Sequence, residues 1–192
     1  GDTRAVAGQL ASGVVGLRIS WRAIAALKEH GTVVTWGDPH RGGNSTAVAS
    51  QLLLGDVVQL HSTFFGAFAA VKRGGAVVTW GDPASGSDSS AVAAQLTSGV
   101  VLICAGSRAF AAKKDGGAVV AWGDPESGGD ASAKAGQLTS GVTSLHTTGS
   151  AFAVLKERGA VVAWGLPDRG GDVGAMDVLL RRGVISIYSN DG

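Results

Sequence analysis

The side chains best suited to metal or acid–base chemistry recur at one position of a repeating segment. Each follows the Leu or Ile of a Val-rich run, once Asp56 is treated as an insertion. The five members of this column are Arg18, His61, Cys104, His146 and Tyr188. His and Cys are common zinc ligands, so His61, Cys104 and His146 would suit a metal or polar ligand site. We favour the alternative, a lined channel, because equivalent positions on separate repeats lie too far apart for zinc–ligand distances of about 2.0–2.3 Å.

No other group of residues follows a known catalytic or cofactor-binding pattern. The sequence holds no Gly-x-Ser-x-Gly, no His-Glu-x-x-His and no P-loop. Asn44, Asp88, Asp130 and Asp172 repeat, but without the spacing of a calcium loop. Asp and Asn side chains accept hydrogen bonds from the backbone two residues on, and this explains these positions better. We therefore expect no enzyme, no cofactor and no resident metal.

The composition indicates a folded chain with no general attraction to nucleic acid. The 192 residues are 45% hydrophobic and 16% charged, and the net charge is +1. A disordered chain would be less apolar and more charged, and a nucleic-acid binder would be more basic. One cysteine excludes an intramolecular disulfide. No apolar run approaches the roughly 18 residues of a membrane span, no signal peptide is visible, and the compartment cannot be assigned from these features.

One nine-residue motif occurs four times and defines the repeat. It is GTVVTWGDP at 31–39, GAVVTWGDP at 75–83, GAVVAWGDP at 117–125 and GAVVAWGLP at 159–167, so its tryptophans are 44, 42 and 42 residues apart. A Gln-Leu pair and a Gly before a Val-rich run keep the same period. The chain is thus one repeat domain with units 13–54, 55–98, 99–140 and 141–182 and a partial unit 183–192, in which we expect a lone first strand.

Each unit contains the pattern of three strands and one helical turn. In the fourth unit the strands are expected at 142–145, 151–155 and 160–164, with a hairpin turn at 156–159 that ends in Gly. Residues 91–96 of the second unit carry Val92 and Leu96 four residues apart, as one or two helical turns would. Phe68, Phe110 and Phe152 mark the second strand and are expected in the core.

The third strand is apolar on both faces, which predicts that both faces are covered. In residues 118–122, Ala118, Val120 and Trp122 alternate with Val119 and Ala121. Small sheets stacked radially satisfy this pattern, so we predict an all-β fold, a β-propeller or partial propeller with one blade of about 42 residues per repeat. An open β-solenoid stack is the alternative. Trp122 would fill the gap between sheets, while Gly123 and Pro125 turn the chain.

These units resemble the RCC1-like repeat family. The resemblance is carried by SGV-x-x-L … AFA-x-LK-x-x-GAVVAWG at 140–165 and covers essentially the whole chain. The short repeat is similar to that of the propeller-type β-lactamase inhibitory protein, and WGDP-x-x-GGD-x-SAVA-x-QL is similar to tandem repeats of dinoflagellate-type algae. The family implies a seven-bladed propeller and includes exchange factors for small GTPases, inhibitors and scaffold modules. The similarity to algal repeats would favour localisation in an organelle such as the chloroplast.

The chain departs from the family in the number of its repeats. About four and a half repeats are too few for seven blades, so we expect this chain to be a segment of a longer repeat array. A small closed ring or an open curved stack are the alternatives. Exposed half-blades would leave unpaired strand edges.

Two sets of residues could contact a protein partner. The hairpin turns are basic and would line one rim, either as a dock for an acidic partner or, as we favour, as charges that protect strand edges. This rim comprises Lys72, Arg73, Lys113, Lys114, Lys156 and Arg158. Trp21, Phe64 and Phe65 break the repeat pattern and are either an exposed contact or local packing.

These features predict a non-catalytic protein–protein interaction or scaffold module. It would be an accessory subunit of a larger complex, such as a photosynthetic assembly, that binds protein and not nucleic acid. The alternative is a regulator of an enzyme, resembling the exchange factors or the inhibitors of the family.

Overall fold

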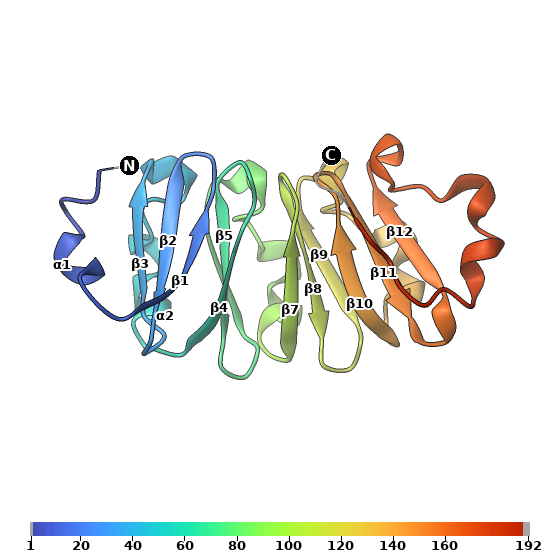
Figure 1. The fold of residues 1–192 in the computed structure, drawn as a ribbon, viewed down its shortest axis with the longest axis horizontal. Coiled ribbons are helices and arrows are strands. Elements are labelled where there is room, and N and C mark those ends of the chain that lie inside the picture. The colour runs from blue at the N-terminus through green and yellow to red at the C-terminus, as the bar shows by residue number, and fades with distance from the viewer. Residues whose placement is uncertain (1, 190–192) are drawn as a thin grey trace.

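The repeat builds four three-stranded antiparallel sheets that stand side by side. A computed structural model describes residues 2–189. Each sheet consists of three consecutive strands in chain order, so no strand crosses between sheets. Figure 1 shows the sheets in a row, with the first strands β1, β4, β7 and β10 toward the viewer and the linking segments behind. We call each first strand the inner strand and each third strand the outer strand.

The elements follow the repeat closely. The strands are β1 Val14–Ile19, β2 Ala23–Lys28, β3 Val33–Gly37, β4 Val57–Ser62, β5 Ala67–Lys72, β6 Val77–Gly81, β7 Val100–Ala105, β8 Ala109–Lys114, β9 Val119–Gly123, β10 Val142–Thr147, β11 Ala151–Lys156 and β12 Val161–Gly165. The α-helices are α1 Ala7–Leu10 and α2 Ala49–Leu52. The 3₁₀ turns are η1 Pro39–Arg41, η2 Thr46–Val48, η3 Pro83–Ser85, η4 Ser90–Leu96, η5 Pro125–Ser127, η6 Ser132–Gln137, η7 Glu157–Gly159, η8 Pro167–Arg169, η9 Gly174–Met176 and η10 Leu179–Arg181.

Glycines in the hairpin turns attach each sheet to the next one. Gly75 adopts a φ of 79°, and its carbonyl accepts a hydrogen bond of 3.1 Å from the N–H of Val100, where the next inner strand starts. A Cβ on Gly75 would stand 2.4 Å from that nitrogen. Gly117 and Val142 form the same bond at 3.1 Å. Glycine is therefore required here by both the positive φ and the close approach of the next sheet.

Short side-chain bonds shape the linkers, as the sequence pattern predicts. Asp82 accepts a bond of 3.2 Å from the N–H of Ala84 and so caps η3. Leu166 stands at the corresponding place before η8 and makes no side-chain cap. Asp88 and Asp130 accept bonds of 3.0 and 2.8 Å from backbone N–H groups two residues on. The repeated Asp and Asn positions thus form turns.

Both faces of the outer strand are covered, which confirms the prediction from its apolar pattern. Val120 and Trp122 of β9 lie in one core cluster with residues of the preceding sheet. Val119 and Ala121, on the other face, pack against a cluster shared with the following sheet. Phe68, Phe110 and Phe152 are among the most buried side chains of the chain, as predicted.

A tryptophan closes every interface between neighbouring sheets. The indole N–H groups of Trp80, Trp122 and Trp164 donate to the carbonyls of Gly42, Gly86 and Gly128 in the preceding unit, at 3.1, 3.0 and 3.0 Å. Each indole also stacks on the phenylalanine of the adjacent second strand, with ring centroids 5.2–5.5 Å apart. We call this contact the tryptophan–glycine bond.

The fifth unit begins in the expected place but forms no strand within residues 183–189. The N–H of Val184 donates to the Gly159 carbonyl at 3.1 Å, the bond that also starts β4, β7 and β10. Within the described residues, no second strand pairs with this segment, and Ile185 and Tyr188 are 92% and 91% exposed. The rest of the expected strand, 190–192, lies outside the described residues. Across residues 2–189, no helix has the length and apolarity needed to span a bilayer.

Replacing Trp122 with Ala should destabilise the chain by about 3–5 kcal/mol, because a large side chain that is 3% exposed leaves a cavity and the Gly86 carbonyl loses its donor. Trp21→Ala is the matched control, since Trp21 is 56% exposed, and should cost under about 1 kcal/mol. Urea unfolding followed by circular dichroism measures both. Equal losses in the two variants would contradict the assigned role of Trp122.

Candidate functional site

The structure places four members of the Arg–His–Cys column at matching positions on the inner strands. Arg18, His61, Cys104 and His146 pair in register with Ala25, Ala69, Ala111 and Ala153 of the second strands. Tyr188, the fifth member, lies in a segment that forms no strand within residues 183–189, and it is 91% exposed.

The polar atoms of the column bond to close neighbours. His61 Nε2 lies 3.1 Å from Gln59 Oε1, and His146 Nε2 lies 2.9 Å from Ser144 Oγ. The Cys104 thiol donates to the Leu145 carbonyl of the next sheet at 3.3 Å. Within residues 2–189, no three His, Cys, Asp or Glu side chains lie close enough to hold a metal ion. The column therefore offers no preformed ligand set in this part of the chain.

Burial suppresses the charged forms of the two most reactive side chains. It lowers the pKa of His61 to about 4, with a smaller contribution from the positive charge of Arg18. It raises the pKa of the Cys104 thiol to about 11. At neutral pH the imidazole is neutral and the thiol keeps its proton. A protonated, half-buried thiol is a poor nucleophile.

Several of the basic residues predicted to form a rim are already paired. Lys114 donates through Nζ to the Gln95 carbonyl at 2.7 Å, and Lys156 donates in the same way to Gln137. Lys72 instead forms an ion pair of 3.2 Å with Asp56, the residue inserted in the second unit. These lysines thus join the last residue of the second strand to the preceding linker or to the inserted acid.

The remaining basic residues of the predicted rim stand in a strand or in exposed turns. Lys113 lies inside β8, opposite Val119, where the second sheet has Val71 opposite Val77. Arg73 and Arg158 are exposed in turns, and Arg158 has a φ of 67°.

Trp21, Phe64 and Phe65 come together at the loops that join inner and second strands. Trp21 and Phe64 are 56% and 57% exposed. Phe65 lies between them and meets both rings edge to face, with centroids 6.3 and 5.1 Å away. The guanidinium groups of Arg22 and Arg108 stand 4.3 Å from the ring centroids of Trp21 and Phe65. We call these five residues the aromatic edge.

Backbone hydrogen bonds hold the loops of the aromatic edge together. The N–H of Trp21 donates to the Phe64 carbonyl at 2.8 Å, and the N–H groups of Phe64 and Phe65 donate to Gly106 and Ser107 at 3.3 and 3.2 Å. Arg41 donates to the Phe65 carbonyl at 3.1 Å and forms an ion pair with Asp82. Because three sheets fix these loops, the exposed rings have defined positions, which lowers the entropy lost when a partner binds.

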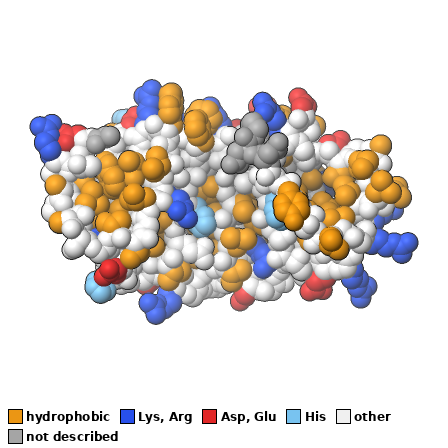
Figure 2. Space-filling view, viewed as in Figure 1, with side chains coloured by type: hydrophobic (Ala, Val, Ile, Leu, Met, Phe, Trp, Pro, Cys, Tyr) orange, Lys and Arg blue, Asp and Glu red, His pale blue; other side chains and the backbone are white. Residues whose placement is uncertain are grey.

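Two apolar features adjoin the aromatic edge. A hollow of about 480 Å³ lies beside Phe64 and is lined by Ile19, Gly106 and Thr147 among others. Hydrophobic side chains also gather over the first sheet (Figure 2), where Leu17 is 48% exposed although its counterpart Leu60 is 4% exposed. The difference arises because, within residues 2–189, no sheet covers the first sheet on that side.

Comparison with known proteins rests on structure, because no family model and no curated protein matches the sequence. Prp20p from Saccharomyces cerevisiae superposes with a TM-score of 0.56 at 18% identity, over 80% of this chain and 44% of Prp20p. Yeast RCC1 (Prp20) bound to Kap60 superposes with a TM-score of 0.57 at 17% identity, over 80% and 43%. The chain has the RCC1-like propeller fold. It spans less than half the length of these RCC1 structures.

The RCC1-like loops also contain two site residues that the sequence pattern did not single out. Arg22 and Arg108 flank the loops but reach aromatic rings, and Arg108 reaches a ring of the neighbouring unit. Their equivalent places in the repeat, directly before the Ala that opens the second strand, could have marked them.

Lowering the pH should destabilise the fold through His61. In the unfolded chain the His61 imidazole takes up a proton near pH 6.5, whereas in the folded chain it does so only near pH 4. The contribution of neutral His61 to the free energy of unfolding is therefore fully present above pH 6.5 and is lost as the pH falls from 6.5 toward 4. Urea midpoints at pH 7.0 and 4.5 should differ less in His61→Gln than in the wild type. His40→Gln, at an exposed loop position, should leave the difference unchanged. An unchanged difference in His61→Gln would contradict the assignment.

Proposed function

We propose that the chain is a non-catalytic protein-binding module that docks its partner on the aromatic edge. The observation that carries the proposal is the exposure of Trp21 and Phe64 on loops held by hydrogen bonds from three sheets. Tryptophan and arginine are enriched in binding hot spots, and phenylalanine is enriched at protein–protein interfaces. A monomer without a partner gains nothing from keeping such rings in water.

The arginines on the rings give the edge a positive component. Arg22 lies 3.8 Å from Asp38, and its side chain is 54% exposed, so part of its guanidinium is free to meet a partner. A guanidinium stacked on an aromatic ring keeps its hydrogen-bond donors at the ring edge, where a carboxylate can pair with them. The partner surface would therefore combine apolar groups with acidic ones.

The solved relatives support a protein ligand in general terms only. Prp20p was characterised for its binding to Gsp1p and histones, and its Kap60 complex has been solved. A regulator of an enzyme, the alternative drawn from the sequence, would use the same edge, and the identity of the partner distinguishes it from a scaffold. A place as accessory subunit of a larger assembly, photosynthetic or other, stays a prediction.

The double variant Trp21→Ala/Phe64→Ala should recover at least tenfold less partner than the wild type, because it removes both exposed rings while the core stays intact. The measurement is quantitative mass spectrometry of proteins recovered on the immobilised chain from native extract. The control carries Ser at four rim positions, Lys72, Arg73, Lys113 and Lys114, and should retain capture. If the aromatic variant still captured the partner and the rim variant did not, the docking site would be the rim and not the aromatic edge.

A further inference from the structure

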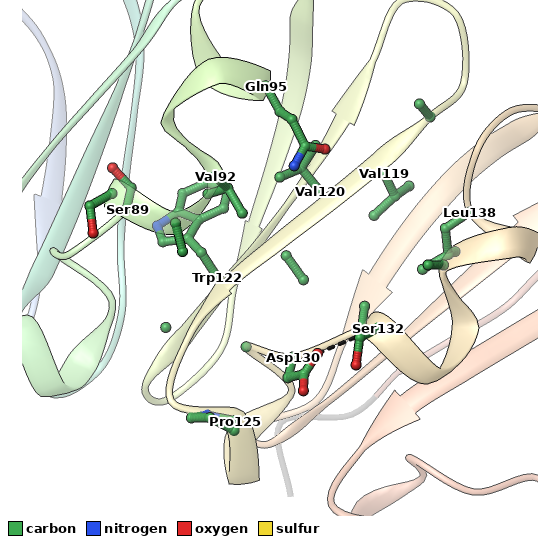
Figure 3. A pocket seen from close by; sticks show the side chains of 18 of the residues that line it. Ser89, Val92, Gln95, Val119, Val120, Trp122, Pro125, Asp130, Ser132 and Leu138 are labelled. Atoms are coloured by element: carbon green, nitrogen blue, oxygen red, sulfur yellow. Dashed lines mark hydrogen bonds between the residues drawn. The ribbon is translucent and has the colours of Figure 1, made fainter.

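A second groove, of about 760 Å³, follows the outer edge of β9, and nothing in the sequence patterns pointed to it. In Figure 3, Val92 and Gln95 of η4 stand on one side of this strand and Leu138 stands on the other. The sheet order β7-β8-β9 places the groove at the edge opposite the inner strand. We call it the β9 groove.

One pair of side chains that lines the β9 groove differs from its counterparts in the first two units. In the first two units a threonine of the outer strand bonds a serine of the following linker, Thr35 with Ser45 at 3.1 Å and Thr79 with Ser89 at 3.0 Å. The third unit has Ala121 and Ala131 at these places. Two methyl groups cannot form this hydrogen bond, and both residues line the groove.

The fourth unit shows the opposite outcome at the same position. There Val173 stands at the place of Ala131 in the repeat, and Ala163 is 5% exposed, whereas Ala121 is partly exposed. Valine fills more of the space than alanine does. Ala121 is thus more accessible than its counterpart in the fourth unit.

The backbone of β9 offers one free pairing position inside the groove. Ala118 accepts from Lys114, and Asp124 donates to Arg108, so these even-numbered residues bond toward β8. Alternation along a strand turns the N–H and C=O of Val119, Ala121 and Gly123 outward.

Linker residues lie against the outward-facing backbone groups at both ends of β9. Val119 donates to the Leu138 carbonyl at 2.8 Å. At the other end, the Cβ position of Gly129 lies 2.3 Å from the Gly123 oxygen. Among residues 2–189, no hydrogen bond from outside the sheet engages Ala121.

The charges around the groove have one sign. Among residues 2–189, Asp88 and Asp130 are the only ionisable residues that line it, and both are exposed. Bonds from Ser90 and Ser132 lower the pKa of these carboxyls, so both are ionised at neutral pH. No Lys or Arg of the described part of the chain lines the groove. A positively charged ligand therefore fits it best.

We propose that the β9 groove binds an extended peptide that pairs with both backbone groups of Ala121, places a small apolar side chain between Ala121 and Ala131, and carries basic residues on its flanks. An open strand edge supplies the backbone bonds of such β-strand addition, and the flanking pockets supply specificity. This site is separate from the aromatic edge and does not depend on the function proposed for that edge.

Refilling the groove tests the proposal. The probe is a fluorescein-labelled nonapeptide, Lys-Lys-Val-Thr-Val-Ala-Val-Lys-Lys, and the measurement is fluorescence anisotropy. The variant Ala121→Thr/Ala131→Ser restores the pair found in the second unit, so it should fold normally and bind the probe at least tenfold more weakly. The control Ala163→Thr/Val173→Ser makes the same change in the fourth unit and should bind as the wild type does. No binding by the wild type, or equal binding by the refilled variant, would overturn the proposal.

Charge and backbone pairing are tested with the same probe. Asp88→Asn/Asp130→Asn keeps both turns, because an amide oxygen also accepts a bond, and should weaken binding severalfold. A probe with Glu in place of its flanking Lys should bind at least tenfold more weakly. N-methylation of the central Val should abolish binding, and the Ala121 amide should exchange more slowly with solvent when the unmodified probe is bound. Indifference to methylation, or unchanged exchange at Ala121, would exclude strand pairing.

Discussion

The tryptophan–glycine bond is the interaction on which the array depends. A buried indole N–H without an acceptor costs about 1–3 kcal/mol, and the carbonyl of Gly86 meets that need for Trp122. Gly86 can occupy this place because its φ of 104° suits glycine and because a Cβ would stand 3.0 Å from the Phe110 ring. Three conspicuous residue types of the repeat, Trp, Phe and Gly, therefore serve one contact between sheets.

Because this contact is the same at three interfaces, function must reside where the units differ. The second unit has an inserted Asp56 that takes Lys72 as its partner, and the loop with Phe64 and Phe65. The third unit has Ala121 and Ala131 in place of a bridging Thr–Ser pair. These changes leave the tryptophan–glycine bond untouched, so the scaffold tolerates them, and each produces a distinct surface on the same framework.

Much of the fold could be predicted because repetition reveals which residues share an environment. The strand order, the hairpin glycines, the covered faces of the outer strand and the buried phenylalanines all follow from local pattern and period. The candidate site was predicted only in part. Trp21, Phe64 and Phe65 stood out as breaks in the pattern, but Arg108 reaches Phe65 from the next unit, and no local pattern reports a contact across 43 positions. The pairing of Lys114 with the Gln95 carbonyl was missed for the same reason.

By itself the sequence determined the repeat, the strands and the two-sided covering, because periodicity and side-chain polarity depend on residues close in the chain. Only the tertiary structure decided which side chains remain accessible. Lys72, Lys114 and Lys156 are paired with neighbouring groups, and Trp21 meets Phe65 near Arg108. Tyr188 is exposed, and Ala121 lines a groove. Accessibility depends on what the neighbouring unit places against a residue, and that is fixed by the packing of whole sheets rather than by any short stretch of sequence.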